Sequence, residues 1–142
     1  MRPPAAIVRV PLRWVDLDAQ GHVNNAVVAD YLQEARVRFL LEGANAALLG
    51  NGTLVVGHQV EYLAPVEFAN DPVEVRLWLG QVGASRFTIG YEVVQGEVIA
   101  ARARTVRRAG VVLFGVPPDR RSSGRRPRAL SPGPGPRWVL PR

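Results

Sequence analysis

Residues 14–41 read WVDLDAQGHVNNAVVADYLQEARVRFLL, and this stretch joins a short polar loop to a helical pattern. In its second half apolar residues recur every three or four positions, which predicts an amphipathic helix with one apolar stripe. The stripe consists of Val28, Tyr31, Leu32, Ala35, Phe39 and Leu40. Asn24 or Asn25 is expected to cap the start of this helix, and Gly43 to stop it. The polar loop therefore lies at the N-terminus of a long helix, where free N–H groups suit an anion or a polarised carbonyl oxygen.

The segments around this stretch alternate between apolar and polar residues, as strands with one buried face do. Before the loop the apolar positions are Val8, Val10, Leu12 and Trp14, and Pro11 indicates that this strand is either at an edge of the sheet or irregular at that position. After the helix the alternation returns in residues 54–62, 73–79, 87–93 and 99–103, with a short last strand at 111–114. In the first of these segments the expected buried face contains Leu54, Val56, His58, Val60 and Tyr62. This order predicts an α+β domain in which one long helix covers an antiparallel sheet of about five to six strands.

The C-terminal part of the chain differs in composition from the rest. Residues 117–142 are rich in Pro, Gly, Ser and Arg without any period, so we expect a disordered tail after a single domain at residues 1–116. The tail holds seven arginines and one acid, while residues 1–116 hold eleven of each, so the net charge of +6 belongs to the tail. Because Trp138 is its single aromatic residue and gives no base-stacking pattern, nucleic-acid binding is the weakest functional hypothesis.

The residue types also limit the chemistry and the location. No cysteine is present, which excludes disulfides and thiolate ligands, and with only two histidines the sequence favours no metal site. No phosphate-binding loop, dinucleotide fingerprint or Ser-His-Asp pattern is found. The N-terminal residues contain no long apolar run, so we expect a cytoplasmic protein without a secretory signal or a membrane span.

The pattern D-x-D-x-x-G-H-V-N-N over residues 16–25, followed by a helix with E-A-R at 34–36, resembles a known family. It is similar to the hotdog-fold acyl thioesterases, in the branch with 4-hydroxybenzoyl-CoA thioesterase-like proteins and plant acyl-carrier-protein thioesterases. The resemblance covers residues 7–115. It implies a sheet wrapped around the helix and hydrolysis of an acyl-CoA or acyl-carrier-protein thioester to a free acid and a thiol, with no cofactor. It also implies a homodimer or homotetramer, with sheets joined edge to edge and the active site between subunits.

Asp18 is the leading candidate for catalysis. Thioester hydrolysis needs a base that activates water or a carboxylate nucleophile, and the resemblance assigns this role to the position of Asp18. The alternative is that Asp18 only caps a turn. His22 is a candidate proton carrier or orienting group, or else pins the loop, and Gln20 stands where plant relatives carry an asparagine. Asn24 is a candidate to bind water or the thioester carbonyl, which leaves Asn25 as the expected helix cap.

Other polar residues of the chain receive different expectations. Asp16 is expected to be structural and to bond loop N–H groups, and His58 to be a core or interface histidine rather than a catalyst. The resemblance implies a substrate-binding set of Gly21, Val23, Asn25, Ser85 and Arg86. Arg86 can pair with a phosphate of CoA, or it can be a solvated arginine at a strand end.

Two further functions fit the same pattern. One is a non-catalytic module that binds acyl-CoA or an acyl carrier protein. The other is a hydratase, although hydratases of this fold pair Asp and His differently. Retention of Asp18, His22 and Asn24 together favours the thioesterase over the binding module.

Overall fold

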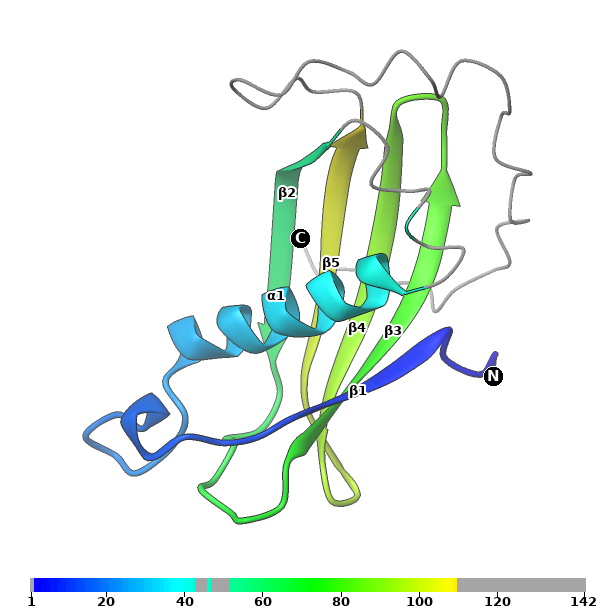
Figure 1. The fold of residues 1–142 in the computed structure, drawn as a ribbon. Coiled ribbons are helices and arrows are strands. Elements are labelled where there is room, and N and C mark those ends of the chain that lie inside the picture. Colours follow the sequence, from blue (N-terminus) through cyan, green and yellow to red (C-terminus); the bar gives the residue numbers. More distant parts are fainter. Residues whose placement is uncertain (1, 43–45, 47–51, 110–142) are drawn as a thin grey trace.

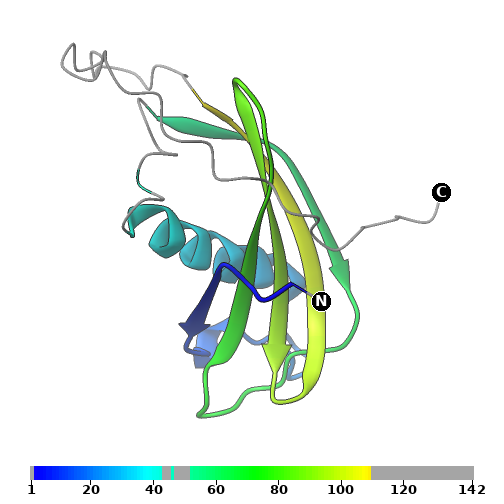
Figure 2. The same cartoon turned by 90° about the vertical axis from the view of Figure 1, so that its right-hand side faces the viewer.

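The computed structural model describes residues 2–42, 46 and 52–109 of the chain. The elements in order are β1 (Ala6–Val10), the 3-10 turn η1 (Trp14–Asp16), α1 (Asn25–Leu41), β2 (Thr53–Tyr62), β3 (Val73–Val82), β4 (Arg86–Gln95) and β5 (Val98–Ala109). The strands form one antiparallel sheet in the order β1-β3-β4-β5-β2, with β1 and β2 at its edges. Helix α1 crosses one face of this sheet, which curves around it (Figures 1 and 2). This confirms the predicted α+β hotdog architecture.

The core lies between the apolar stripe of α1 and the inward face of the sheet. On the helix, Val28, Leu32, Ala35 and Phe39 are at most 2 % exposed, as the helical period predicts. On the sheet, the fully buried inward residues include Val73, Val75, Leu77, Ile89, Tyr91 and Val93. Each large apolar side chain removed from water in this way contributes about 1.5–3 kcal/mol, so the helix and sheet hold one another in place.

The first strand is shorter than its sequence pattern predicts. β1 ends at Val10, and Trp14, expected on its buried face, is 74 % exposed and begins η1. Pro11 has no N–H to extend the ladder. The backbone N–H of Arg13 donates instead to the carboxylate of Asp16 at 3.1 Å, which turns the chain away from the sheet. The expectation for Trp14 was therefore wrong, and its ring packs edge-on against Phe68 with centroids 5.3 Å apart.

Strand β2 also departs from simple alternation. Its register with β5 shifts between Val55 and Gly57, which marks a β-bulge. Because the bulge adds one residue, even-numbered positions before it and even-numbered positions after it point to opposite faces of the sheet. Leu54 and Val56 consequently do not share a buried face with Val60, and both are exposed. A bulge is a pairing feature, so the alternating pattern of residues 54–62 did not reveal it.

The remaining predictions about the elements have different outcomes. The strand expected at residues 99–103 extends without interruption from Val98 to Ala109, where it pairs with both β4 and β2. The strand expected at residues 111–114, the helix stop at Gly43 and the tail at residues 117–142 all lie outside the described residues. Within the described residues, α1 ends at Leu41.

Candidate functional site

The polar loop before α1 closes on itself through backbone hydrogen bonds. Leu17 and Val23 form an isolated antiparallel bridge, and the N–H of Asp18 donates to His22 O at 2.8 Å. Gly21 donates its N–H to Asp18 O at 3.0 Å and has a φ of 78°, a left-handed conformation that glycine adopts without strain. The spacing from Asp18 to Val23 therefore forms a tight hairpin-like turn that presents its side chains beside the helix.

The carboxylate of Asp18 is held by this turn through one oxygen. Its Oδ1 accepts the N–H of Gln20 at 2.8 Å and that of His22 at 3.4 Å. The turn-capping alternative raised for Asp18 is thus observed. Both of these hydrogen bonds use Oδ1, so the turn leaves Oδ2 for a ligand. Asp18 can therefore cap the turn through one oxygen and contact a substrate or water through the other.

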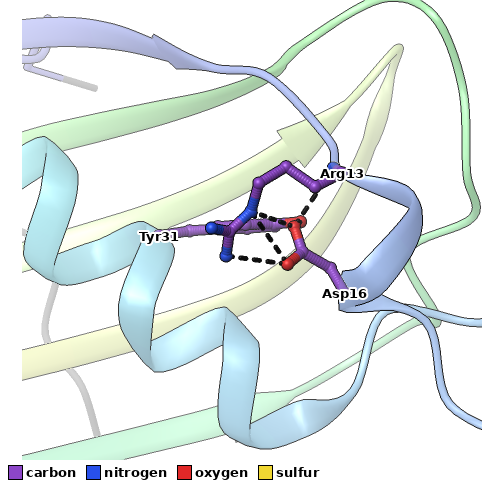
Figure 3. A network of polar contacts seen from close by, with 3 residues as sticks. All are labelled: Arg13, Asp16 and Tyr31. Carbon is purple, nitrogen blue, oxygen red and sulfur yellow. Dashed lines mark hydrogen bonds and ion pairs between the residues drawn. The ribbon is translucent and has the colours of Figure 1, made fainter.

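Asp16, two residues earlier, is buried and forms a network with the buried Tyr31 and the exposed Arg13 (Figure 3). Its side chain is 1 % exposed; Oδ2 accepts the hydroxyl of Tyr31 at 2.6 Å, and Oδ1 pairs with Nη2 of Arg13 at 2.8 Å. Burial alone would raise the pKa of Asp16, but the hydrogen bonds from Arg13 and Tyr31 outweigh it and hold this pKa below its usual value. Its backbone oxygen also accepts the N–H of Asn24 at 2.9 Å. Asp16 thus has the structural contacts expected of it, because it ties the loop to the middle of α1.

The start of α1 is capped by Asn24, not by Asn25 as the sequence analysis expected. Asn24 has non-helical backbone angles, with φ of −57° and ψ of 135°, and its Oδ1 accepts the N–H of Ala26 at 2.9 Å. Its backbone oxygen accepts the N–H groups of Val27 at 2.9 Å and Val28 at 3.2 Å. The N–H of Asn25 is therefore the donor of the first turn that the cap does not use. Asn25 is the first residue of α1 and lines the pocket described next.

An open pocket of about 310 Å³ lies between the loop, the start of α1 and the end of β2. Its lining includes Asp18, Gln20, His22, Val23, Asn25, Tyr62 and Pro65. The hydroxyl of Tyr62 donates to the backbone oxygen of Asn25 at 2.9 Å, which fixes the strand end against the helix start. The pocket thus combines a carboxylate, an imidazole and a helix N-terminus, the groups that acyl transfer requires.

The structure brings together only part of the predicted site. Asp18, His22, Val23 and Asn25 line the pocket, whereas Gly21 and Asn24 belong to the backbone that shapes it. Ser85 and Arg86 lie elsewhere: β4 runs from Arg86 to Gln95, and Gln95 is bonded to Glu67 beside the loop. The two ends of this ten-residue strand are nine residue steps apart, so Arg86 lies about 30 Å from the loop in the same chain.

Sequence reasoning missed the wall of the pocket formed by Tyr62 and the segment through Pro65. Nothing local identifies Tyr62 as a site residue, because its role depends on the end of β2 meeting the start of α1. His58, on the same strand, is exposed in this chain, with Nδ1 3.1 Å from Thr105 Oγ1. It is therefore not a core histidine, and the interface alternative stays a prediction.

The described residues contain no group of three or more His, Cys, Asp or Glu placed to hold a metal ion. Over the same part of the chain, α1 is too short and too polar to cross a membrane, and no other helix is a candidate.

This chain belongs to the thioesterase-like superfamily, whose family model matches residues 12–111. Among solved structures it is similar to a thioesterase of Thermus thermophilus complexed with coenzyme A and Zn, with 30 % identity, a TM-score of 0.68, and coverage of 78 % of this chain and 83 % of that one. A 1,4-dihydroxy-2-naphthoyl-CoA thioesterase of Synechocystis has 25 % identity and a TM-score of 0.61, covering 72 % and 79 % of the two chains. A hypothetical protein of Aquifex aeolicus has 27 % identity and a TM-score of 0.62, covering 72 % and 97 %. No curated protein matches the chain.

Proposed function

We propose that this protein is an acyl-CoA thioesterase that hydrolyses its substrate to a free acid and the CoA thiol. The observation that carries the proposal is the carboxylate of Asp18, anchored through Oδ1 in a pocket that also contains the start of α1. Family membership and the thioesterases among its structural neighbours, one solved with coenzyme A, support this class of substrate.

The reaction follows from the groups in the pocket. A water molecule adds to the thioester carbonyl carbon while its proton passes to Asp18, or Asp18 attacks that carbon directly and water then hydrolyses the anhydride. The carbonyl oxygen becomes negative and is stabilised by the unused N–H of Asn25 and by the positive end of α1. Collapse of the tetrahedral intermediate breaks the carbon–sulfur bond in either route, and the released thiolate takes up the proton that the attacking water gives up, through Asp18 in the first route and on hydrolysis of the anhydride in the second. His22, which lines the same pocket, is placed to orient the water or to carry this proton.

The substrate-binding role of Ser85 and Arg86 requires a second subunit, because both lie too far from Asp18 in one chain. β2 is an edge strand on which Leu54, Val55 and Val56 are between 37 % and 47 % exposed, and an apolar edge of this kind favours pairing with another strand. Two β2 edges paired antiparallel would set the end of one strand beside the start of the other. The start of β2 pairs with the end of β5, and the end of β5 pairs in turn with Arg86 at the start of β4. Arg86 of the partner subunit would therefore lie two strand spacings, about 10 Å, from the paired β2 edge.

The direct test is Asp18→Asn, which keeps the size of the side chain and the bonds to the loop but removes the base. We expect thiol release from acyl-CoA to fall at least about 100-fold, with little change in the melting temperature. Asp71→Asn is the matched control, since Asp71 is an exposed carboxylate in the turn before β3, and its activity should be unchanged.

Two results would count against the proposal. Near-normal turnover by Asp18→Asn on the best substrate of an acyl-CoA panel would remove Asp18 from the chemistry. Acyl-CoA binding without any thiol release by the unmodified protein would favour the non-catalytic acyl-binding module instead.

A further inference from the structure

The segment between β2 and β3 pairs with the polar loop that carries Asp18. The N–H of Val23 donates to Val66 O at 2.8 Å, and His22 forms an isolated antiparallel bridge with Glu67. On the other side of the loop, His22 O accepts the N–H of Asp18 at 2.8 Å. The backbone of His22 is therefore held between two neighbouring segments, as in a central strand, and a shift of either one moves it.

The main chain of Glu67 is held from its far side by Gln95, the last residue of β4. The N–H of Glu67 donates to Oε1 of Gln95 at 3.0 Å, and Nε2 of Gln95 donates to Glu67 O at 2.7 Å. In an antiparallel strand the main-chain groups of successive residues point to opposite sides, so Val66 bonds the loop while Glu67 faces away from it. A side-chain amide offers one acceptor and two donors. Gln95 thus takes the place of a neighbouring strand at this residue.

Gln95 stands on a rigid part of the sheet. It is half-buried and pairs with Val98 across the hairpin that joins β4 to β5. The turn of this hairpin contains Gly96 with a φ of 61°, a conformation that glycine adopts without strain. The segment that Gln95 holds is also anchored by Val66, which is 3 % exposed in the core. Burial of Val66 fixes how deep the segment lies, and the two bonds of Gln95 fix how its backbone is turned.

The site loop is sensitive to small movements of this segment. The N–H of His22 donates to Oδ1 of Asp18 at 3.4 Å, which is longer than the usual bond. A further separation of about 0.3 Å would break it, and the carboxylate would keep only the N–H of Gln20 at 2.8 Å. His22 and Asp18 both line the pocket, so the same movement changes the geometry of the two side chains there. A misplacement of about 1 Å can slow a reaction about 100-fold.

We propose that Gln95 is a positioning residue for thioester hydrolysis. By holding the main chain of Glu67, it fixes where His22 and the carboxylate of Asp18 stand in the pocket. Gln95 lies outside the lining of the pocket, so it acts through Glu67 and not on the substrate. This inference rests on the proposed function, since the positioned groups are those assigned to the reaction.

The test is Gln95→Met, which keeps the length of the side chain and removes both hydrogen bonds to Glu67. We expect kcat for thiol release from acyl-CoA to fall about tenfold. KM should change by less than about twofold, because Gln95 does not contact the substrate. Hydrogen exchange at the N–H of Val23, measured by NMR on the full chain, should become at least about tenfold faster. The melting temperature should change little, because Val66 stays buried.

Two further variants complete the test. Gln81→Met is the matched control, since Gln81 is exposed at the far end of β3, and kcat and exchange should stay unchanged. Gln95→Glu keeps an acceptor for the N–H of Glu67 but turns an oxygen toward Glu67 O in place of the donor. It should lower kcat and speed the exchange of Val23 in the same direction as Gln95→Met.

Several outcomes would overturn the inference. Unchanged kcat in Gln95→Met, with or without a lower melting temperature, would show that Gln95 does not position the site. Unchanged exchange at Val23 would show that Gln95 does not hold the loop. Failure of both Gln95 variants to fold would make Gln95 a residue of the fold instead. No thiol release by the unmodified protein from any acyl-CoA would defeat the proposed function and this role with it, whereas equal activity of Gln95→Met and an active unmodified protein would defeat this inference alone.

Discussion

The hydrogen bond from Tyr31 to Asp16 provides the sharpest test of how the loop is held. It is 2.6 Å long and joins a tyrosine that is 3 % exposed to a carboxylate that is 1 % exposed (Figure 3). Tyr31→Phe removes only the hydroxyl and keeps the ring that packs in the core. The carboxylate keeps its contacts with Arg13, but the side chain of Arg13 is 62 % exposed, so solvent screens that ion pair.

The magnitude follows from the kind of bond. A hydrogen bond to a charged group contributes about 1.5–3 kcal/mol, and its loss leaves a buried oxygen less well satisfied. For a domain of this size that loss corresponds to a fall in melting temperature of about 5–15 °C. Arg13→Gln should produce a much smaller fall, because it removes the screened partner.

The dependence on pH adds a second readout. Burial, and next the hydrogen bond to Asp16, raise the pKa of Tyr31. Above pH 10 the unfolded tyrosine loses its proton while the folded one keeps it, so stability falls as the pH rises through this range. In Tyr31→Phe this contribution is absent, and the stability should fall less between pH 9 and about 11.

Urea unfolding of the unmodified protein, Tyr31→Phe, Asp16→Asn and the double variant measures both effects. The two single changes should be strongly non-additive, because each removes the same contact. A Tyr31→Phe protein with unchanged stability at pH 7, or fully additive effects in the double variant, would refute the assigned role of this network.

Three other changes test separate features. Val56→Asp puts a charge on the exposed edge of β2 and should convert an oligomer into a monomer, as measured by light scattering. The control Glu61→Asp on the same strand should leave the oligomer intact. A monomeric unmodified protein would contradict the proposed β2 pairing. Gly21→Ala should destabilise by about 1–2 kcal/mol because its left-handed backbone disfavours a Cβ, although among the described residues no atom beyond the two chain neighbours lies within 4 Å of the added Cβ. Unchanged urea unfolding would show that the loop adopts another conformation. His58 is exposed as a residue, but partial burial of its ring, and next the charge of Arg36, lower the pKa of His58. The unfolded chain therefore binds a proton first, and stability should fall as the pH drops below 6.5. His58→Gln should flatten this fall between pH 7.5 and about 5.5 in urea titrations, and an equally steep fall would assign it to other groups.

Much of the local structure could be predicted from the sequence by itself. The apolar stripe from Val28 to Leu40 determined the helix and its buried face, because a helix repeats every 3.6 residues whatever surrounds it. The turn at Asp18 also depends on neighbours only, since a carboxylate bonds N–H groups two and four residues later and Gly21 supplies the backbone angle. For the same reason the pattern of residues 16–25 predicted a polar loop at the start of α1, and its role as a catalytic site stays a prediction.

Other features depended on segments that meet only in the folded chain. Tyr62 at the end of β2 meets the start of α1, and Thr53 at the start of β2 bonds Arg107 of β5, and neither contact has a local signal in the sequence. The bulge near Val56 and the distance from Asp18 to Arg86 are set by strand pairing and strand length. A sequence determines short-range periods and turns because they involve few residues. Tertiary structure decides which distant side chains share a pocket, because that depends on how the sheet curves around α1.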